Sequence, residues 1–182
     1  MTIQPTIKAN KTQTATVLFL FSLLLTLLLP VLGSQKVAPT YQPVLQYDPN
    51  RDAAVDINAA VAEARRSGRH VLIEVGGQWC IWCHRLDYYL KRNRNLSALL
   101  ERNFVMVKVN YSSENKNEEV LSCYPEVAGY PHFFVLDGQG KFLHSQDVSE
   151  LEKDKSYNAK KFKSFLTRWK PSGSSPVRRT RR

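Results

Sequence analysis

Two cysteines, Cys80 and Cys83, are the residues of this chain best suited to covalent chemistry. They follow a β-prone run, Val71 to Val75, and two glycines, and helical spacing begins directly after them. This predicts a strand, a tight turn and a helix. Unpaired N–H groups and the helix dipole favour a thiolate at a helix start, so Cys80 is a candidate nucleophile. Cys83 lies one turn along and can attack a mixed disulfide at Cys80, which is thiol–disulfide exchange.

The elements that must position this pair follow from the pattern of apolar residues. Alternation and helical spacing predict, in chain order, helix, strand, helix, short helix, strand, brief helix, hairpin and helix. Six of these elements cover residues 52–66, 71–75, 96–100, 104–109, 132–145 and 159–169. The third element is the helix that begins at the cysteines, and the brief helix ends near Cys123. This order predicts an α/β fold with a central mixed sheet and helices on both faces.

Composition limits the chain to one ordinary core. It has 182 residues, 43% of them hydrophobic, and a formal net charge of +10. Basic residues crowd residues 171–182 among Ser, Pro and Gly, so we expect a basic disordered tail there. A solvated end is favoured over a nucleic-acid or anionic-membrane contact, and no base-reading motif accompanies the basic residues.

The N-terminal residues have the pattern of a targeting segment. Lys8 and Lys11 precede an apolar run, Val17 to Leu29, that Pro30 ends. We expect residues 1–33 to be a signal peptide or an N-terminal anchor, with residues 15–32 as the alternative inner-membrane anchor. Either way the protein is exported, periplasmic or secreted, where disulfides persist. Residues 34–51, rich in Pro and Gln, are predicted to be a linker.

Residues 52–170 resemble the thioredoxin superfamily, in particular exported bacterial thioredoxin-like proteins of the periplasmic disulfide-reductase type. Four features carry the resemblance. Trp79 to Cys83, reading WCIWC, matches the WCxxC of the family, and Glu74 falls where the family places a buried acid. Lys108 matches the lysine beside that acid, and Gly129 to Pro131 matches the loop with a cis proline. The resemblance implies the thioredoxin fold.

The resemblance also implies a role for each catalytic residue. Cys80, exposed at the helix start, would attack the substrate disulfide, and the more buried Cys83 would resolve the mixed disulfide. Glu74, its pKa raised by burial, would accept the Cys83 proton, and Lys108 would pair with Glu74. The alternative for Glu74 is an outward-facing strand residue.

A substrate groove is expected around the cysteines. Pro131 in the cis form would present the backbone of Tyr130 to an extended protein segment, whereas a trans proline would merely begin a strand. Trp79, Ile81, Trp82 and Tyr130 would rim this groove.

Some positions depart from the pattern of the family. An Ile-Trp dipeptide separates the cysteines, and His132 follows the proline, so the direction of electron flow is open. His84 and Arg85 add positive charge near the pair. Cys123 is predicted to be a small buried residue near the active-site loop, with a third redox partner as the alternative.

The sequence therefore predicts an exported thiol–disulfide oxidoreductase, with a reductase favoured over an oxidase. Its partners would be protein disulfide substrates and an upstream thiol donor. No cofactor is expected, since the electrons reside in the Cys80–Cys83 disulfide. Cys80 to His84 also satisfies the CxxCH signature of c-type haem attachment, so an electron-transfer protein is one alternative. A thioredoxin-fold peptide-binding module is another, and a zinc site lacks a full ligand set.

Overall fold

A computed structural model describes residues 40–173 of the chain. The signal peptide or anchor expected at residues 1–33 lies outside the described residues, as does the tail from residue 174 onward. Within residues 40–173, none of the helices is long and apolar enough to cross a membrane.

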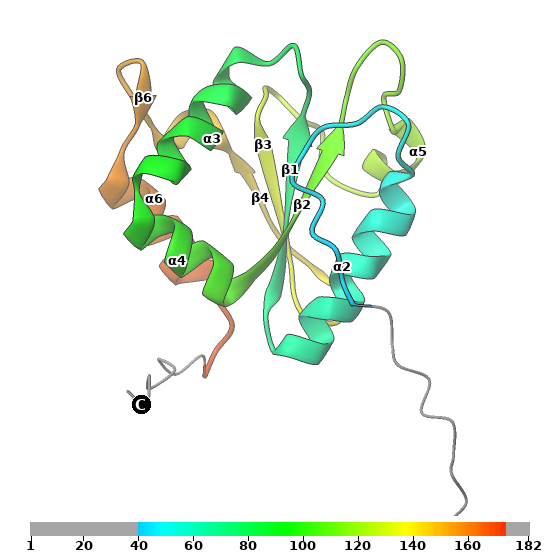
Figure 1. Cartoon of the computed structure of the whole chain (residues 1–182), viewed down its shortest axis with the longest axis horizontal. Coiled ribbons are helices and arrows are strands. Elements are labelled where there is room, and N and C mark those ends of the chain that lie inside the picture. Colours follow the sequence, from blue (N-terminus) through cyan, green and yellow to red (C-terminus); the bar gives the residue numbers. More distant parts are fainter. Residues whose placement is uncertain (1–39, 174–182) are drawn as a thin grey trace, which may run out of the picture. The chain divides into compact units, whose positions relative to one another are not determined.

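A four-stranded mixed sheet forms the centre of the fold (Figure 1), in the order β2-β1-β3-β4. Its strands are β1 (His70–Gly76), β2 (Phe104–Asn110), β3 (His132–Leu136) and β4 (Phe142–Asp147). The central strand β1 pairs parallel with β2 and antiparallel with β3, and β3 and β4 form the expected hairpin. The predicted fold class is therefore confirmed.

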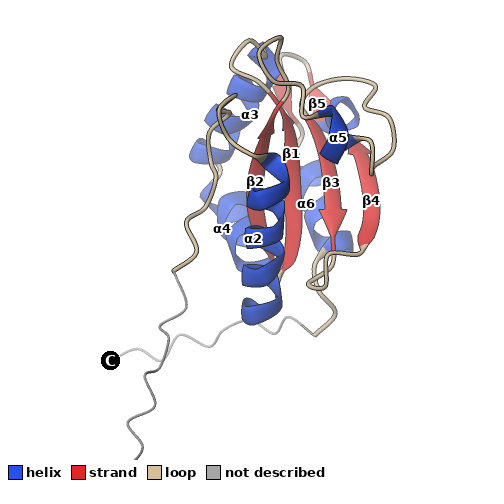
Figure 2. Cartoon of the chain, turned by 90° about the vertical axis from the view of Figure 1, so that its right-hand side faces the viewer, coloured by secondary structure: helices blue, strands red, loops and turns tan. Residues whose placement is uncertain are grey.

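Helices cover both faces of this sheet, as Figure 2 shows. Helix α2 lies on one face, and α3, α4 and α6 lie on the other. The bounds are α2 (Ala53–Ser67), α3 (Ile81–Arg92), α4 (Arg94–Asn103), α5 (Glu118–Leu121) and α6 (Ala159–Trp169). Because both faces are covered, β1 is apolar and buried along nearly its whole length.

Local signals explain where α2 begins and ends. Asp52 caps it by accepting hydrogen bonds from the backbone N–H groups of Ala54 and Val55. Gly68 ends it in the left-handed region at φ 67°, which a residue with a side chain rarely adopts. The helix predicted for residues 52–66 is thus confirmed.

The alternation of β1 side chains separates two apolar clusters. Val71, Ile73 and Val75 face α2, whereas Leu72 lies in the cluster built with α3, α4 and α6. Glu74 follows Leu72 by two residues, so its side chain points to the α3 side of the sheet. The acid is therefore placed in a core layer, beneath the helix that carries the cysteines.

Two segments are more ordered than the sequence analysis predicted. Residues 146–157, which lie between the predicted hairpin and the predicted last helix, contain a short 3-10 helix, η1 (Val148–Leu151), and a small hairpin of β5 (Glu152–Lys153) and β6 (Ser156–Tyr157). Residues 40–51, the described part of the predicted linker, run along β2, where Val44 pairs with Val107. This lead-in segment buries Val44 and Tyr47 against the domain.

Candidate active site

Cys80 and Cys83 lie where β1 leads into α3, and they are joined by a disulfide. Cys80 is the N-cap of α3, and its sulfur accepts a hydrogen bond from the Cys83 N–H at 3.1 Å. The prediction that Cys80 is exposed is wrong, because only 3% of its surface is accessible. Tyr47, Trp82 and Tyr130 pack around the pair and shelter it. The backbone of the helix start is nonetheless arranged to stabilise negative charge on the Cys80 sulfur.

Glu74 lies behind the pair on β1 and is fully buried, so it does not face outward. Its Oε1 accepts a hydrogen bond from the hydroxyl of Tyr47. Among the described residues, Oε2 has no hydrogen-bond partner. Burial raises the pKa of Glu74, and this effect outweighs the opposing effects of Lys108 and Tyr47. A carboxylate in this state can take up a proton more readily than one in water.

Lys108 on β2 has two carboxylates within reach. Its Nζ lies 3.6 Å from Glu74 Oε1, and 2.6 Å and 2.7 Å from the two oxygens of Asp87. The contact of Lys108 with Glu74 is the one predicted, whereas the ion pair with Asp87 was not expected. The available signal was the spacing of Asp87 from Cys83, one helical turn along α3.

Tyr47 is a further site residue that the sequence analysis missed. It comes from the lead-in segment, is 5% exposed, and reaches Glu74 through its hydroxyl. The Lys108 ammonium lies 4.7 Å from the centre of its ring, so the ring carries a cation–π contact. No motif or periodicity marks Tyr47 in the sequence.

Gly76, the last residue of β1, is required by the close approach of two side chains. A Cβ at this position would lie 2.5 Å from Cys83 Sγ and 2.7 Å from the Tyr47 hydroxyl oxygen. Both distances are shorter than van der Waals contact allows. The absence of a side chain at Gly76 therefore lets the tyrosine and the inner sulfur come together.

The residues predicted to rim a groove divide into two groups. Trp79 and Ile81 are 57% and 59% exposed, and Tyr130 packs edge-on against Trp79. Trp82 is partly buried: besides its contact with the cysteine pair, it packs against Tyr157 of β6, and its carbonyl oxygen accepts the hydrogen bond of the Tyr157 hydroxyl. The rim therefore consists of Trp79, Ile81 and Tyr130.

The loop before β3 carries the expected cis peptide bond, between Tyr130 and Pro131. Pro131 is buried, and Tyr130 also stacks on Tyr111 at 5.0 Å between ring centres. His132 is buried as well, with Nε2 at 2.7 Å from the Ser145 hydroxyl, and burial lowers its pKa. The imidazole is thus favoured in its neutral form.

The residues that follow Cys83 have partners other than the sulfurs. His84 Nε2 lies 2.8 Å from the carbonyl oxygen of Gln78. The Arg85 guanidinium lies over the Trp82 ring at 4.4 Å. The positive charge of Arg85 can therefore act on the pair only through space.

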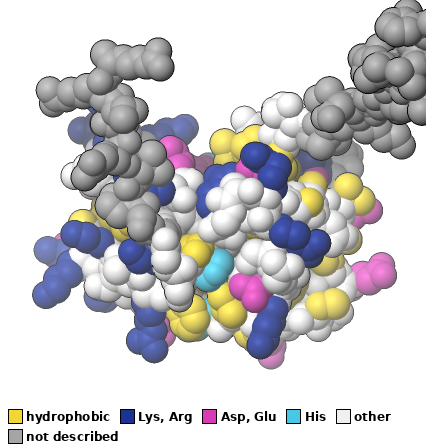
Figure 3. Space-filling model, turned by 90° about the horizontal axis from the view of Figure 1, so that it is seen from below, with side chains coloured by type: hydrophobic (Ala, Val, Ile, Leu, Met, Phe, Trp, Pro, Cys, Tyr) yellow, Lys and Arg dark blue, Asp and Glu magenta, His cyan; other side chains and the backbone are white. Residues whose placement is uncertain are grey.

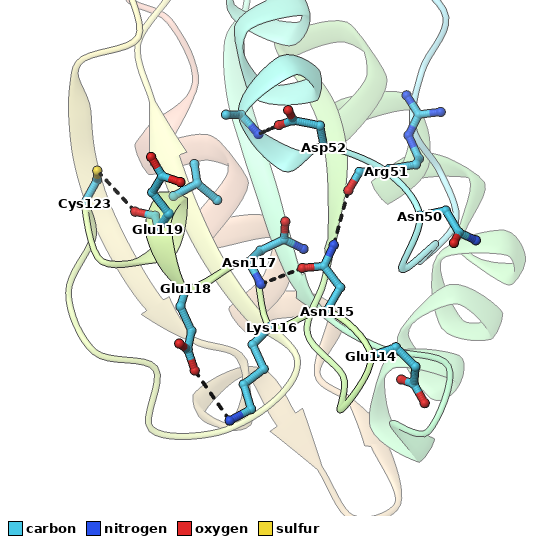
Figure 4. Close-up of a pocket in the computed structure, with 12 residues that line it drawn as sticks. Asn50, Arg51, Asp52, Glu114, Asn115, Lys116, Asn117, Glu118, Glu119 and Cys123 are labelled. Carbon is cyan, nitrogen blue, oxygen red and sulfur yellow. Dashed lines mark hydrogen bonds and ion pairs between the residues drawn. The ribbon is translucent and has the colours of Figure 1, made fainter.

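Cys123 is exposed, so the prediction of a buried thiol is wrong. It follows the short helix α5, too small to cover it, and it lines an open surface pocket of about 1010 Å³ shown in Figure 4. Residues Asn50 to Asp52 form the opposite wall of the pocket, where the Asn115 side chain donates a hydrogen bond to the Arg51 carbonyl oxygen. Neither Cys80 nor Glu74 lines this pocket.

The surface charge is mixed. Figure 3 shows Lys and Arg side chains spread over the lower face, with acidic and apolar groups between them. Within residues 40–173, no group of three or more His, Cys, Asp or Glu side chains is placed to hold a metal ion.

The chain is similar in sequence to known redox proteins. A family model described as thioredoxin-like matches residues 52–138. The chain is 26% identical over 80 residues to the disulfide bond reductase DsbH of Chlamydia pneumoniae, covering 40% of this chain and 48% of that protein. It is 24% identical over 86 residues to the thiol:disulfide interchange protein DsbD of Salmonella typhi, covering 47% and 15%. The chain thus spans less than half the length of either relative.

Among solved structures, the chain is similar to a disulphide isomerase from Xylella fastidiosa Temecula1. The two share 26% identity at a TM-score of 0.58, over 67% of this chain and 94% of the other.

Proposed function

The chain carries a thioredoxin-like domain of the thioredoxin superfamily, and from this premise we propose that it exchanges protein disulfides through Cys80 and Cys83. One observation carries the proposal: the two sulfurs are bonded to each other at the N-terminus of α3, and the strand that leads into this helix carries a fully buried carboxyl group on the side that α3 covers. A pair that only stabilised the fold would not need an acid with a raised pKa behind it.

In the proposed reaction, the reduced pair donates two electrons to a substrate disulfide. The Cys80 thiolate attacks one substrate sulfur, forms a mixed disulfide, and releases the other substrate sulfur as a thiolate. Cys83 then loses its proton to Glu74, and its thiolate attacks the Cys80 sulfur. The second substrate thiolate leaves, and the Cys80–Cys83 disulfide forms.

We propose the direction of a reductase. A base that accepts the Cys83 proton promotes the attack that releases reduced substrate, and the similar Chlamydia pneumoniae protein is described as a reductase. Continuous turnover then requires an upstream thiol donor that reduces the Cys80–Cys83 disulfide again. No organic cofactor is needed, because the sulfur pair holds the electrons.

We propose that the substrate is an extended protein segment. The exposed Trp79 and Ile81, with the half-buried Tyr130 packed against Trp79, form an apolar rim next to Cys80, and the backbone beside Pro131 lies at the start of β3. An extended chain can add hydrogen bonds there in the manner of a strand. Because a disulfide substrate requires an oxidising compartment, the export proposed from residues 1–33 is consistent with this role.

The test is reduction of insulin disulfides by the purified, reduced protein. Cys80→Ser is expected to abolish it, whereas Cys83→Ser is expected to trap mixed disulfides that a gel without reductant reveals. Cys123→Ser is the matched control and should keep full activity. Full turnover by both Cys80→Ser and Cys83→Ser, or a haem Soret band in the purified protein, would overturn the proposal.

The direction is tested separately by equilibrating the pair with glutathione buffers. A reduction potential well below that of glutathione supports a reductase, and one well above it contradicts that direction.

A further inference from the structure

We propose that Tyr47, a residue of the lead-in segment before the thioredoxin-like match at residues 52–138, is a positioning residue of the active site. Its hydroxyl holds the Glu74 carboxyl group beside Cys83 and leaves Oε2 to accept the proton of the resolving thiol. The inference rests on the proposed function and assigns part of its proton transfer to a residue outside the matched segment.

The two oxygens of the Glu74 carboxyl group differ in their hydrogen bonds. Oε1 receives the proton of the Tyr47 hydroxyl, so it is already engaged. Oε2 is buried and has no hydrogen-bond partner within residues 40–173. A buried carboxylate oxygen without a donor is costly, so it has a strong tendency to take up a proton. The free acceptor of Glu74 is therefore Oε2.

Tyr47 also lies close to the inner sulfur. The Tyr47 hydroxyl oxygen and Cys83 Sγ both lie within 2.7 Å of the point that a Gly76 Cβ would occupy. Two atoms so close to one point are neighbours. The hydroxyl that binds the Glu74 carboxyl group thus also lies near the thiol that must lose its proton.

Tyr47 is held in place by contacts on both sides. Its carbonyl oxygen accepts a hydrogen bond from the Gln78 side chain at 3.2 Å, in the loop that carries the cysteines. Three residues earlier, the Val44 carbonyl accepts the backbone N–H of Lys108 at 2.9 Å. The lead-in segment is thus joined to β2 and to the active-site loop, which fixes the hydroxyl before any substrate binds.

The charged and titratable groups around Glu74 decide the sign of the effect. They are Tyr47 from the lead-in segment, Lys108 from β2, Asp87 and the cysteine pair from α3, and Tyr157 from β6. Burial and the neighbouring carboxylate raise the pKa of Tyr47 well above its ordinary value, so the phenol remains a donor. Its hydrogen bond stabilises the charged form of Glu74 and lowers the pKa of that group. Removing the hydroxyl therefore keeps Glu74 protonated to higher pH.

The experiment follows the Cys83 step alone, in full-length reduced protein carrying Cys123→Ser. The disulfide reagent dithiobis(nitrobenzoate) reacts with Cys80 and releases one thionitrobenzoate, and attack by Cys83 on the mixed disulfide then releases the second. The rate of this second release is measured against pH. The rate should fall at low pH as Glu74 becomes protonated, and we call this part of the pH profile the acidic limb. In Tyr47→Phe, we expect the acidic limb to move to higher pH, with a loss of about tenfold in rate on that limb.

Three comparisons separate positioning from packing. Tyr41→Phe removes a hydroxyl in the same segment that donates a hydrogen bond to the Met106 carbonyl at 3.4 Å, and it should leave the profile unchanged. Glu74→Gln should remove the limb, and Tyr47→Phe added to Glu74→Gln should then have no further effect. Tyr47→Leu lacks the same hydroxyl in a smaller side chain and should reproduce the shift.

The inference is overturned if Tyr47→Phe and Tyr47→Leu keep the wild-type limb, or if Tyr47→Phe slows the Glu74→Gln protein as much as it slows the wild type. Either outcome with an active wild-type protein leaves the proposed function intact. If instead the wild-type protein reduces no insulin disulfides, the proposed function itself is contradicted.

Discussion

The ammonium group of Lys108 lies 2.6 Å from the carboxylate of Asp87, one helical turn beyond Cys83. Strand β2 is thereby joined to α3 at the point where α3 carries the inner sulfur. The Lys108 side chain is 3% exposed and Asp87 is 36% exposed, so the pair bridges the buried acid and the solvent. Lys108 interacts with both carboxylates, so a change in the charge of Asp87 alters the interaction of Lys108 with Glu74.

Asp87→Asn should shift proton uptake by Glu74 in the direction opposite to Tyr47→Phe. The charge of Asp87 raises the pKa of Glu74, and its removal also frees Lys108 to pair with Glu74. We expect the acidic limb of the second thionitrobenzoate release to move to lower pH, with a gain of about two- to threefold on that limb. Glu101→Gln, an exposed change on α4, is the control. A shift to higher pH would contradict the charge sharing.

Glu74→Gln should change how stability depends on pH. Burial raises the pKa of Glu74 above its ordinary value of 4.5, so the folded protein binds this proton more tightly than the unfolded chain. The free energy of unfolding then falls as pH rises from about 4.5 through the raised pKa. The advantage of Glu74→Gln over the wild type should therefore be larger at pH 8 than at pH 5, as measured by urea unfolding of the oxidised proteins. Parallel curves for the two proteins would rule out the raised pKa.

Gly76→Ala should destabilise the oxidised protein by about 1 to 3 kcal/mol. The added Cβ would lie 2.5 Å from Cys83 Sγ and 2.7 Å from the Tyr47 oxygen, so one of the two must move. Thermal unfolding measures the loss. Gly129→Ala adds the same methyl group where no atom lies within 4 Å, and it should be close to neutral. Equal effects of the two changes would contradict the crowding at Gly76.

Iodoacetamide should distinguish Cys123 from the active-site cysteines. Cys123 is exposed and free, whereas Cys80 and Cys83 are joined in a disulfide. Mass spectrometry of the native oxidised protein is expected to find alkylation at Cys123 alone, and prior reduction should add Cys80. Because Cys123 lies apart from the pair, its alkylation should leave insulin reduction unchanged. Loss of activity on alkylation of the oxidised protein would indicate a role for this thiol.

Much of the fold can be predicted from the sequence, because the signals that define its elements are local. The cap at Asp52, the left-handed end at Gly68 and the spacing of apolar residues in α6 each depend on neighbours within a few positions. The hairpin at β3 and β4 was readable for the same reason. Residues 146–157 were not, since η1 and the two-residue strands β5 and β6 are too short to show a period.

The site likewise contains features that local patterns predict and features that only the packing decides. A strand that leads into a helix is a local pattern, and it placed Cys80 and Cys83 correctly at the start of α3. Two-residue alternation along β1 puts Glu74 on the face opposite to Ile73. Alternation alone does not say whether that face meets solvent or a core layer. The packing of α3 over it decides that Glu74 is buried.

Long-range contacts supplied the rest of the site. Tyr47 is 27 residues from Glu74 in sequence, and Asp87 is 21 residues from Lys108. No periodicity connects positions so far apart, because each period describes one element and not the way in which two elements meet. The burial of Cys80 and the exposure of Cys123 depend in the same way on which segments cover them.

The sequence by itself determined the elements, their order and the sulfur pair at a helix start, because these follow from backbone preferences and from spacing within short stretches. Only the tertiary structure decided which side chains surround the buried acid. The path of the lead-in segment along β2 brings in the phenol of Tyr47, and the packing of α3 on the sheet brings in the carboxylate of Asp87. Both arrangements arise from burial of apolar surface between distant segments, which no single stretch of the sequence encodes.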